Sequence, residues 1–170
     1  MPMADPYFKE LTLQPDLLLD EINSIDKEKQ IWSDHFGFHA IELDPNLIQA
    51  DAALKLVHQV QPIARIGLLM IRPLNFYKWH TDGFRQCCLN MLISQDHSSH
   101  TLFGRQFDYQ NMSIVELKYK PKTLYLFNNQ EQHCVINFNG PRYLFSLYFC
   151  EETPYQIVRD RLAAAGLLAP

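Results

Sequence analysis

Hydrophobic residues recur with two different periods along this chain, and the period changes near residue 63. Over Pro15–Ile25 and Pro45–Val60 the apolar positions follow helical spacing, and Asp44 is placed to cap the second segment. A last helix is predicted over about residues 155–165, following a proline. The pattern therefore predicts a helical N-terminal part over about residues 1–62 and one further helix near the C-terminus.

Between these helical parts, short runs of β-branched and aromatic residues are separated by Pro, Asn, Gly, Asp and Ser, which is typical of successive strands. The predicted strands are Arg65–Ile71, Arg85–Ser94, Thr101–Tyr109, Ser113–Tyr119, Thr123–Asn128, Gln132–Phe138 and Arg142–Cys150. The stretch from Trp32 to Ile41 has no firm assignment and is compatible with an edge strand. We therefore expect a mainly β fold with flanking helices, in which a double-sheet roll or barrel spans about residues 63–150.

Length and composition favour one domain over residues 1–170. The chain has 170 residues, of which 47% are hydrophobic, so it can bury a core without a disulfide or a structural metal. Its net charge of −4 and its scattered Lys and Arg residues argue against a nucleic-acid partner. No apolar segment is long enough for a signal peptide or a membrane helix, so we expect a cytoplasmic protein without a membrane partner. The four cysteines lack CxxC spacing and are interpreted as reduced core thiols, and the adjacent Cys87 and Cys88 would point to opposite faces of a strand.

The first candidate for chemistry is the segment Trp79-His80-Thr81-Asp82-Gly83. It places an imidazole and a carboxylate two residues apart, and in an extended chain both can turn toward one centre where the strand ends. Alone, the pair is equally compatible with a solvated turn in which the carboxylate accepts backbone hydrogen bonds. The motif therefore needs independent support.

Support comes from the segment between His133 and Ser146. Its Asn139-Gly140 pair is a strong hairpin signal, which would pair the flanking strands and place His133 opposite Ser146. Arg142 would then lie roughly 13 Å along its strand from the point opposite His133, at about 3.3 Å per residue. That gap suits a five-carbon diacid. We therefore expect a molecule such as 2-oxoglutarate to chelate a metal at His133 with its keto-acid end while its distal carboxylate pairs with Arg142.

Two histidines and one carboxylate are the ligand set expected of a non-haem iron(II) site. His80, Asp82 and His133 would occupy one face of an octahedral ion and leave three positions open, two for the cosubstrate and one for dioxygen. A structural zinc site would instead be closed by four ligands, usually including cysteine. We expect further cosubstrate contacts from the hydroxyl groups of Ser146 and Tyr125 and from the amide of Asn90, although a hydrogen-bonded strand asparagine is an equal alternative for the last.

The order of these residues resembles that of the 2-oxoglutarate- and iron(II)-dependent oxygenases. His80-Thr81-Asp82 is followed by the distant His133 and, nine residues later, by Arg142, and the resemblance extends over about residues 66–150. The prolyl hydroxylases and the aspartyl/asparaginyl β-hydroxylase-like proteins are the most similar branches. The resemblance implies a double-stranded β-helix, that is, a jelly-roll or cupin-like fold, with the four residues above as metal ligands and cosubstrate anchor.

The resemblance also implies a reaction, in which a small-molecule or peptidyl substrate is hydroxylated while 2-oxoglutarate is converted to succinate and CO2. Tyr148 stands where the nucleic-acid demethylase branch usually carries a second arginine, so base repair is disfavoured. Arg85, Trp79 and Tyr77 are the expected substrate contacts. Two alternatives stay open: a cupin-like isomerase or hydrolase that uses a divalent metal without 2-oxoglutarate, and a non-catalytic binding module. The sequence predicts neither the substrate's identity nor the oligomeric state.

Overall fold

The part of the chain that the structure describes forms two antiparallel sheets and four short helices. The structure, a computed structural model, describes residues 6–94, 98–106 and 108–170. Its helices are α1 (Asp16–Ser24), α2 (Leu47–Ala50), α3 (Ala52–Val60) and α4 (Tyr155–Ala164). Its strands are β1 (Phe8–Glu10), β2 (Ser33–His35), β3 (Phe38–Glu42), β4 (Ile63–Ile71), β5 (Asn75–His80), β6 (Cys87–Leu92), β7 (Ser99–Gln106), β8 (Met112–Leu117), β9 (Tyr125–Asn128), β10 (His133–Asn137) and β11 (Arg142–Phe149).

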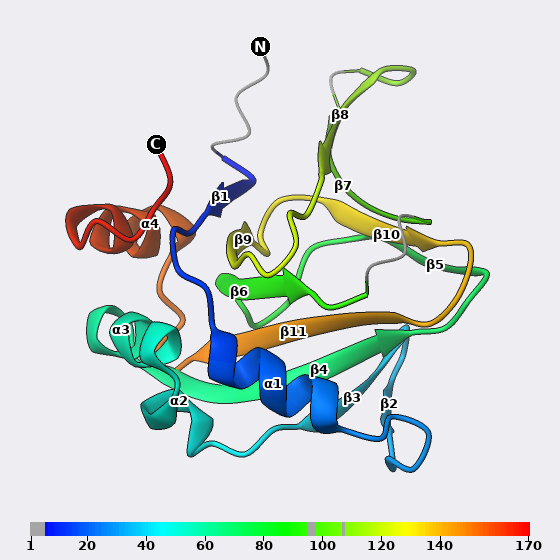
Figure 1. Cartoon of the computed structure of the whole chain (residues 1–170). Helices are drawn as coiled ribbons and strands as arrows, with labels where there is room; N and C mark the ends of the chain where they lie inside the picture. The colour runs from blue at the N-terminus through cyan, green and yellow to red at the C-terminus, as the bar shows by residue number, and fades with distance from the viewer. Residues whose placement is uncertain (1–5, 95–97, 107) are drawn as a thin grey trace.

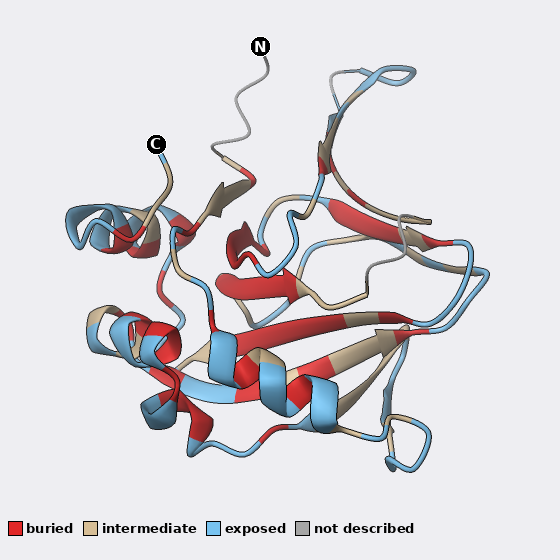
Figure 2. Cartoon of the chain, viewed as in Figure 1, coloured by how far each residue is buried: buried red, intermediate tan, exposed pale blue. Residues whose placement is uncertain are grey.

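The larger sheet has seven strands in the order β1-β9-β6-β11-β4-β3-β2, and the smaller has four in the order β5-β10-β7-β8. Helices α1, α2 and α3 lie against the larger sheet (Figure 1), and apolar residues of these helices share one core with residues of β4, β6 and β11. Burial is heaviest along β6, β9 and β10 (Figure 2). Strand alternation sends Phe145 and Leu147 of β11 into this core. The intervening residues of β11 are thereby left to face the smaller sheet.

The predicted helix over Pro45–Val60 is interrupted at Asp51. This residue ends α2 in an extended conformation, and its buried carboxylate accepts the amide N–H groups of Ala53 and Leu54 at the start of α3. The same carboxylate accepts the amide of Leu18 in α1. Asp51 therefore caps one helix and ties another to it.

All seven predicted strands are present, although their ends shift by a few residues and Phe107, within the expected Thr101–Tyr109, lies outside the described part of the chain. Strand β5, which carries His80, was not among them. The unassigned Trp32–Ile41 stretch forms β2 and β3, with β2 at the sheet edge, and β1 adds a third strand to the part expected to be helical. Such short strands offer too few alternating positions to be distinguished from loops.

The predicted hairpin between β10 and β11 is wrong. β10 pairs with β5 and β7 in the smaller sheet, while β11 pairs with β4 and β6 in the larger one. The Asn139-Gly140 turn instead carries the chain from one sheet to the other, with Gly140 at φ 50°. The amide of Asn137 fixes this crossing by donating to the carbonyls of Ile71, Arg72 and Gly140. Pro141, which has no N–H, cannot start a ladder next to the turn.

The cysteines are all free, and Cys87 and Cys88 point to opposite faces of β6, as predicted: their side chains belong to two separate apolar clusters. Cys150 is exposed rather than buried in the core. No helix within the described residues is long and apolar enough to cross a membrane.

Candidate metal centre and its pocket

Three predicted metal ligands meet at one end of the smaller sheet. His80 is the last residue of β5 and His133 is the first of β10, where the two are paired directly, and Asp82 follows β5 by two residues. Asp82 Oδ1 lies 3.6 Å from Nε2 of His80 and 3.7 Å from Nε2 of His133. One ligand atom from each residue lies within 4.8 Å of the other two. The three side chains thus converge on a single point.

A bulge in β5 makes this convergence possible. Along β10, His133 pairs with His80 and Val135 pairs with Tyr77, so two steps on one strand match three on the other. Strict alternation would have turned Tyr77 and His80 to opposite faces. With the extra residue both face the pocket, and their ring centroids lie 4.2 Å apart.

Backbone carbonyls fix both imidazoles in the tautomer that a metal requires. Nδ1 of His80 lies 2.7 Å from the carbonyl oxygen of Lys78, and Nδ1 of His133 lies 2.8 Å from that of Glu131. Because a carbonyl only accepts, each Nδ1 carries the hydrogen and each Nε2 presents its lone pair to Asp82. Burial lowers the pKa of His133 to about 4, which keeps this imidazole neutral near pH 7.

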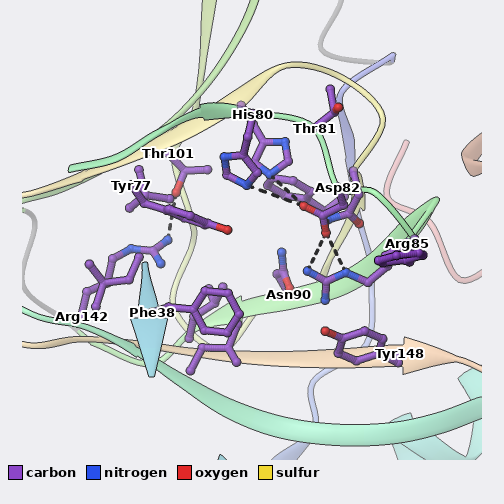
Figure 3. A pocket seen from close by; sticks show the side chains of 18 of the residues that line it. Phe38, Tyr77, His80, Thr81, Asp82, Arg85, Asn90, Thr101, Arg142 and Tyr148 are labelled. Carbon is purple, nitrogen blue, oxygen red and sulfur yellow. Dashed lines mark hydrogen bonds and ion pairs between the residues drawn. The ribbon is translucent and has the colours of Figure 1, made fainter. Parts of the chain in front are cut away.

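The second oxygen of Asp82 is held by the protein. Oδ2 accepts hydrogen bonds from Nε of Arg85 at 2.9 Å and from Nδ2 of Asn129 at 2.8 Å, and Nη2 of Arg85 lies 2.9 Å away (Figure 3). Only Oδ1 is left facing the histidines. Three acceptor atoms therefore face one another at separations that one cation can bridge, so the residues present fit a divalent metal ion held from one face.

Arg142 marks the other end of the pocket. It is the first residue of β11 and is 3% exposed, and Nη2 donates to Thr101 Oγ1 at 2.9 Å. Its Nε has no hydrogen-bond partner, and among the described residues no carboxylate lies within 4 Å of it. The buried hydroxyl of Tyr119 lies beside it, also without a partner in hydrogen-bond geometry. Burial lowers the pKa of Arg142, yet a guanidinium stays protonated. This end fits an anion.

One cavity of about 590 Å³ connects the two ends. It opens between the sheets, and its lining combines the apolar residues Leu69, Ile71, Val135 and Leu144 with polar groups of Tyr77, Asn90 and Thr101. Figure 3 shows Arg142 on one side of it, with His80 and Asp82 on the far side. A cavity of this size holds a small diacid with room to spare.

Most of the site residues named from the sequence line this cavity: His80, Asp82, His133, Arg142, Arg85, Asn90 and Tyr77. Arg85, expected to contact the substrate, is instead engaged with Asp82, and its Nη1 donates to Ser146 Oγ at 3.2 Å. Ser146, expected to contact the cosubstrate, lies under Arg85 and does not line the cavity.

Tyr125 and Trp79 point elsewhere, which corrects two expectations. The Tyr125 hydroxyl accepts the amide N–H of Lys120 and lies 3.4 Å from Glu10, because its ring packs among Tyr119 and Phe8. Trp79 packs beside Gly104 of β7, away from the pocket. The same bulge that brings Tyr77 and His80 to one face turns Trp79 from it.

Several lining residues were not identified from the sequence: Arg65, Thr101, Tyr119, Asn129 and Tyr148. Tyr148 had a usable signal, because it follows Arg142 by an even number of residues along one strand. Thr101, Tyr119 and Asn129 come from other strands and loops, and no local pattern marks them.

Comparisons with known proteins identify the fold. No protein-family model matches the sequence, and no curated protein matches it. Among solved structures, a prolyl-4-hydroxylase from Pseudomonas putida superposes with a TM-score of 0.60 at 17% identity, over 84% of this chain and 91% of that one. A 2OG-Fe(II) oxygenase-family oxidoreductase from Burkholderia pseudomallei gives 0.57 at 10% identity, over 81% and 80%.

A third solved structure is a viral collagen prolyl hydroxylase from Paramecium Bursaria Chlorella virus-1 in complex with 2OG. It gives a TM-score of 0.54 at 14% identity, over 84% of this chain and 94% of that one. At such low identities the likeness concerns the fold. The expected double-stranded β-helix is thereby confirmed.

Proposed function

We propose that this double-stranded β-helix protein is an iron(II)- and 2-oxoglutarate-dependent dioxygenase that hydroxylates a small-molecule or peptidyl substrate. One cavity contains both His80, Asp82 and His133, which are arranged to hold a cation and are called the triad below, and the buried Arg142, which lacks a counter-ion. This combination carries the proposal. Either feature alone would fit many proteins. Together they fit a ligand that chelates a metal at one end and carries an anionic group at the other.

The spacing of the two ends supports 2-oxoglutarate. Along the pocket face of β11, Arg142 and Ser146 are four residues apart, or roughly 13 Å. Arg85 joins Ser146 to Asp82, which places the triad close to Ser146. A guanidinium reaches several Å from its backbone, so the remaining gap suits a five-carbon diacid. The spacing along β11 therefore supports a ligand of this length, although the predicted hairpin is wrong.

Each end of the cavity would have a separate task. His80, Asp82 and His133 would hold iron(II), and Arg142, with the hydroxyl of Thr101, would bind the distal carboxylate in a charge-assisted pair. When bound, iron(II) with 2-oxoglutarate and dioxygen supplies the oxidising chemistry. Because Arg142 is buried, a carboxylate that reaches it would be attracted more strongly than at an exposed arginine.

Turnover of 2-oxoglutarate tests the proposal. Purified protein supplied with iron(II), 2-oxoglutarate and air should form succinate, and replacing iron(II) by zinc(II), removing oxygen or introducing Asp82→Ala should each stop it. Succinate formation that survives all three changes would contradict the proposal. Anaerobic turnover of a substrate would instead favour the cupin-like isomerase or hydrolase, and binding without turnover would favour a binding module.

A further inference from the structure

The pocket has a second positively charged position, at its mouth. Strands β4 and β11 pair so that Ile71, Leu69 and Gly67 lie opposite Arg142, Leu144 and Ser146. The next pair on the same face is Arg65 with Tyr148, and both line the cavity. This pair is six residues from Arg142, or roughly 20 Å along the strands. One face of the ladder therefore carries an arginine at each end.

The triad lies between these two arginines and nearer to the mouth. Arg85 connects Asp82 to Ser146, and Ser146 is two residues from Tyr148 but four from Arg142. Figure 3 shows Tyr148 and Arg142 on opposite sides of the pocket, with Tyr148 next to Arg85. If 2-oxoglutarate fills the Arg142 side, as the proposed function has it, the substrate must enter from the Arg65 side.

Tyr148 orients Arg65 toward that space. The guanidinium carbon of Arg65 lies 4.9 Å from the centroid of the Tyr148 ring, and that of Arg85 lies 4.5 Å from the same centroid. The guanidinium of Arg85 is engaged with Asp82 and Ser146. The Arg65 side chain is 64% exposed, and its Nη1 lies 3.7 Å from Oε1 of Glu42, close enough for an ion pair but too far for a hydrogen bond. Arg65 is thus stacked in place but keeps its N–H groups for an incoming ligand.

The net charge of the cavity lining also favours an anionic ligand. Three arginines line it, Arg65, Arg85 and Arg142, against the single carboxylate of Asp82. A divalent metal and a dianionic cosubstrate would cancel each other and leave this excess unchanged. Glu42, 3.7 Å from Arg65 and itself 77% exposed, offsets only part of this excess, so an acidic substrate would be attracted to the mouth and a basic one repelled.

We infer that the mouth of the pocket is a substrate-anion site, in which Arg65, stacked on Tyr148, binds a carboxylate of the substrate and directs its neighbouring carbons to the metal. The substrate class is therefore an acid, either a free acid or an acidic side chain of a peptide. This inference rests on the proposed function for the direction of entry. It does not depend on that function for the anion site itself.

A matched pair of probes tests the site without knowledge of the substrate. N-acetyl-L-glutamate α-amide and N-acetyl-L-glutamine α-amide have the same shape and differ in charge. Their dissociation constants would be measured by ligand-observed NMR on protein loaded with zinc(II) and 2-oxoglutarate, which cannot turn over. We expect the glutamate probe to bind up to about fivefold more tightly, because Arg65 is 64% exposed and an exposed ion pair is screened by solvent. Free L-glutamate, run alongside, separates a free acid from a peptidyl one.

Two variants assign the preference to Arg65. Arg65→Gln should abolish the difference between the probes, and Arg72→Gln, an equal loss of charge at an exposed residue that does not line the pocket, should retain it. Equal binding of both probes to the wild type, no binding of either, or a preference that survives Arg65→Gln would overturn the inference. If the preference depends on Arg65 but 2-oxoglutarate does not bind, the proposed function fails and the anion site stands.

Discussion

The two ends of the cavity differ in whether their polar atoms find hydrogen-bond partners within the protein. At the metal end, each ligand's second polar atom has a protein partner: the Nδ1 atoms of His80 and His133 meet carbonyls, and Oδ2 of Asp82 meets Arg85 and Asn129. At the other end, Nε of the buried Arg142 has no partner. The metal ligands are therefore oriented before a metal arrives, whereas the arginine end is completed only by a ligand.

The two ends also differ in what they contribute to the free energy of folding. A buried charge without a partner is costly, and the cost is recovered when an anion binds. Removing Arg142 should thus affect ligand binding far more than folding. The residues around Asp82 form a network in which each partner depends on the others, so changes there should affect both.

The largest effect is expected for His133→Ala. It removes one of three ligands, so iron(II) or zinc(II) affinity should fall by at least about a hundredfold, beyond the range seen for outer-shell changes. Calorimetric metal titration would measure it. His100→Ala is the matched control, because His100 pairs with Glu116 and does not line the pocket. Unchanged metal affinity in His133→Ala would remove this residue from the metal site.

Arg142→Met should raise the dissociation constant of 2-oxoglutarate roughly ten- to a hundredfold, the contribution of a charged hydrogen-bonded contact. Metal affinity should stay close to that of the wild type. The ligand-free variant should unfold at the same or a higher denaturant concentration, because an apolar side chain replaces an unpaired buried charge. A parallel loss of metal affinity would argue against the division of the cavity into two ends.

Arg85→Gln tests the network behind Asp82. Oδ2 would keep only Asn129 as a strong donor, so the carboxylate would turn more freely and metal affinity should fall by about tenfold, the lower end of outer-shell effects. Metal titration together with the dissociation constant of 2-oxoglutarate would measure it. If 2-oxoglutarate binding fell while metal binding did not, Arg85 would be a ligand contact rather than a support for Asp82.

Gly37→Ala should have the smallest effect on the metal end. A Cβ at residue 37 would lie 2.5 Å from Cδ2 of Tyr77, whose ring rests against His80, so the ring must shift. We expect a loss of stability of about 1–3 kcal/mol and a change in metal affinity of less than about tenfold. Gly83→Ala is the control, since no atom lies within 4 Å of a Cβ there. Equal effects of the two substitutions would show that the contact with Tyr77 is unimportant.

The sequence allowed the strands and the four central residues to be predicted, because both leave local signals. Runs of β-branched and aromatic residues marked seven of the strands but not β5, and the order of His80, Asp82, His133 and Arg142 was sufficient to predict that they share one cavity. The partner of β10 could not be predicted, because a turn signal fixes a reversal of the chain and not the strand that pairs next.

Other errors have equally physical causes. A bulge leaves no mark in the sequence, so Trp79 was expected in the pocket although it turns away. The orientation of Tyr125 depends on ring packing with residues far along the chain. The engagement of Arg85 with Asp82 could not be predicted, because an ion pair of this kind depends on the folded geometry.

An anaerobic titration of the purified protein with iron(II) and then 2-oxoglutarate tests the central claim most directly. We expect the weak visible charge-transfer band of a keto acid chelated to iron(II) to appear in the wild type. It should be absent in His133→Ala and should require a higher 2-oxoglutarate concentration in Arg142→Met. Iron that binds without producing the band on addition of 2-oxoglutarate, or a band that saturates equally in Arg142→Met, would contradict the account.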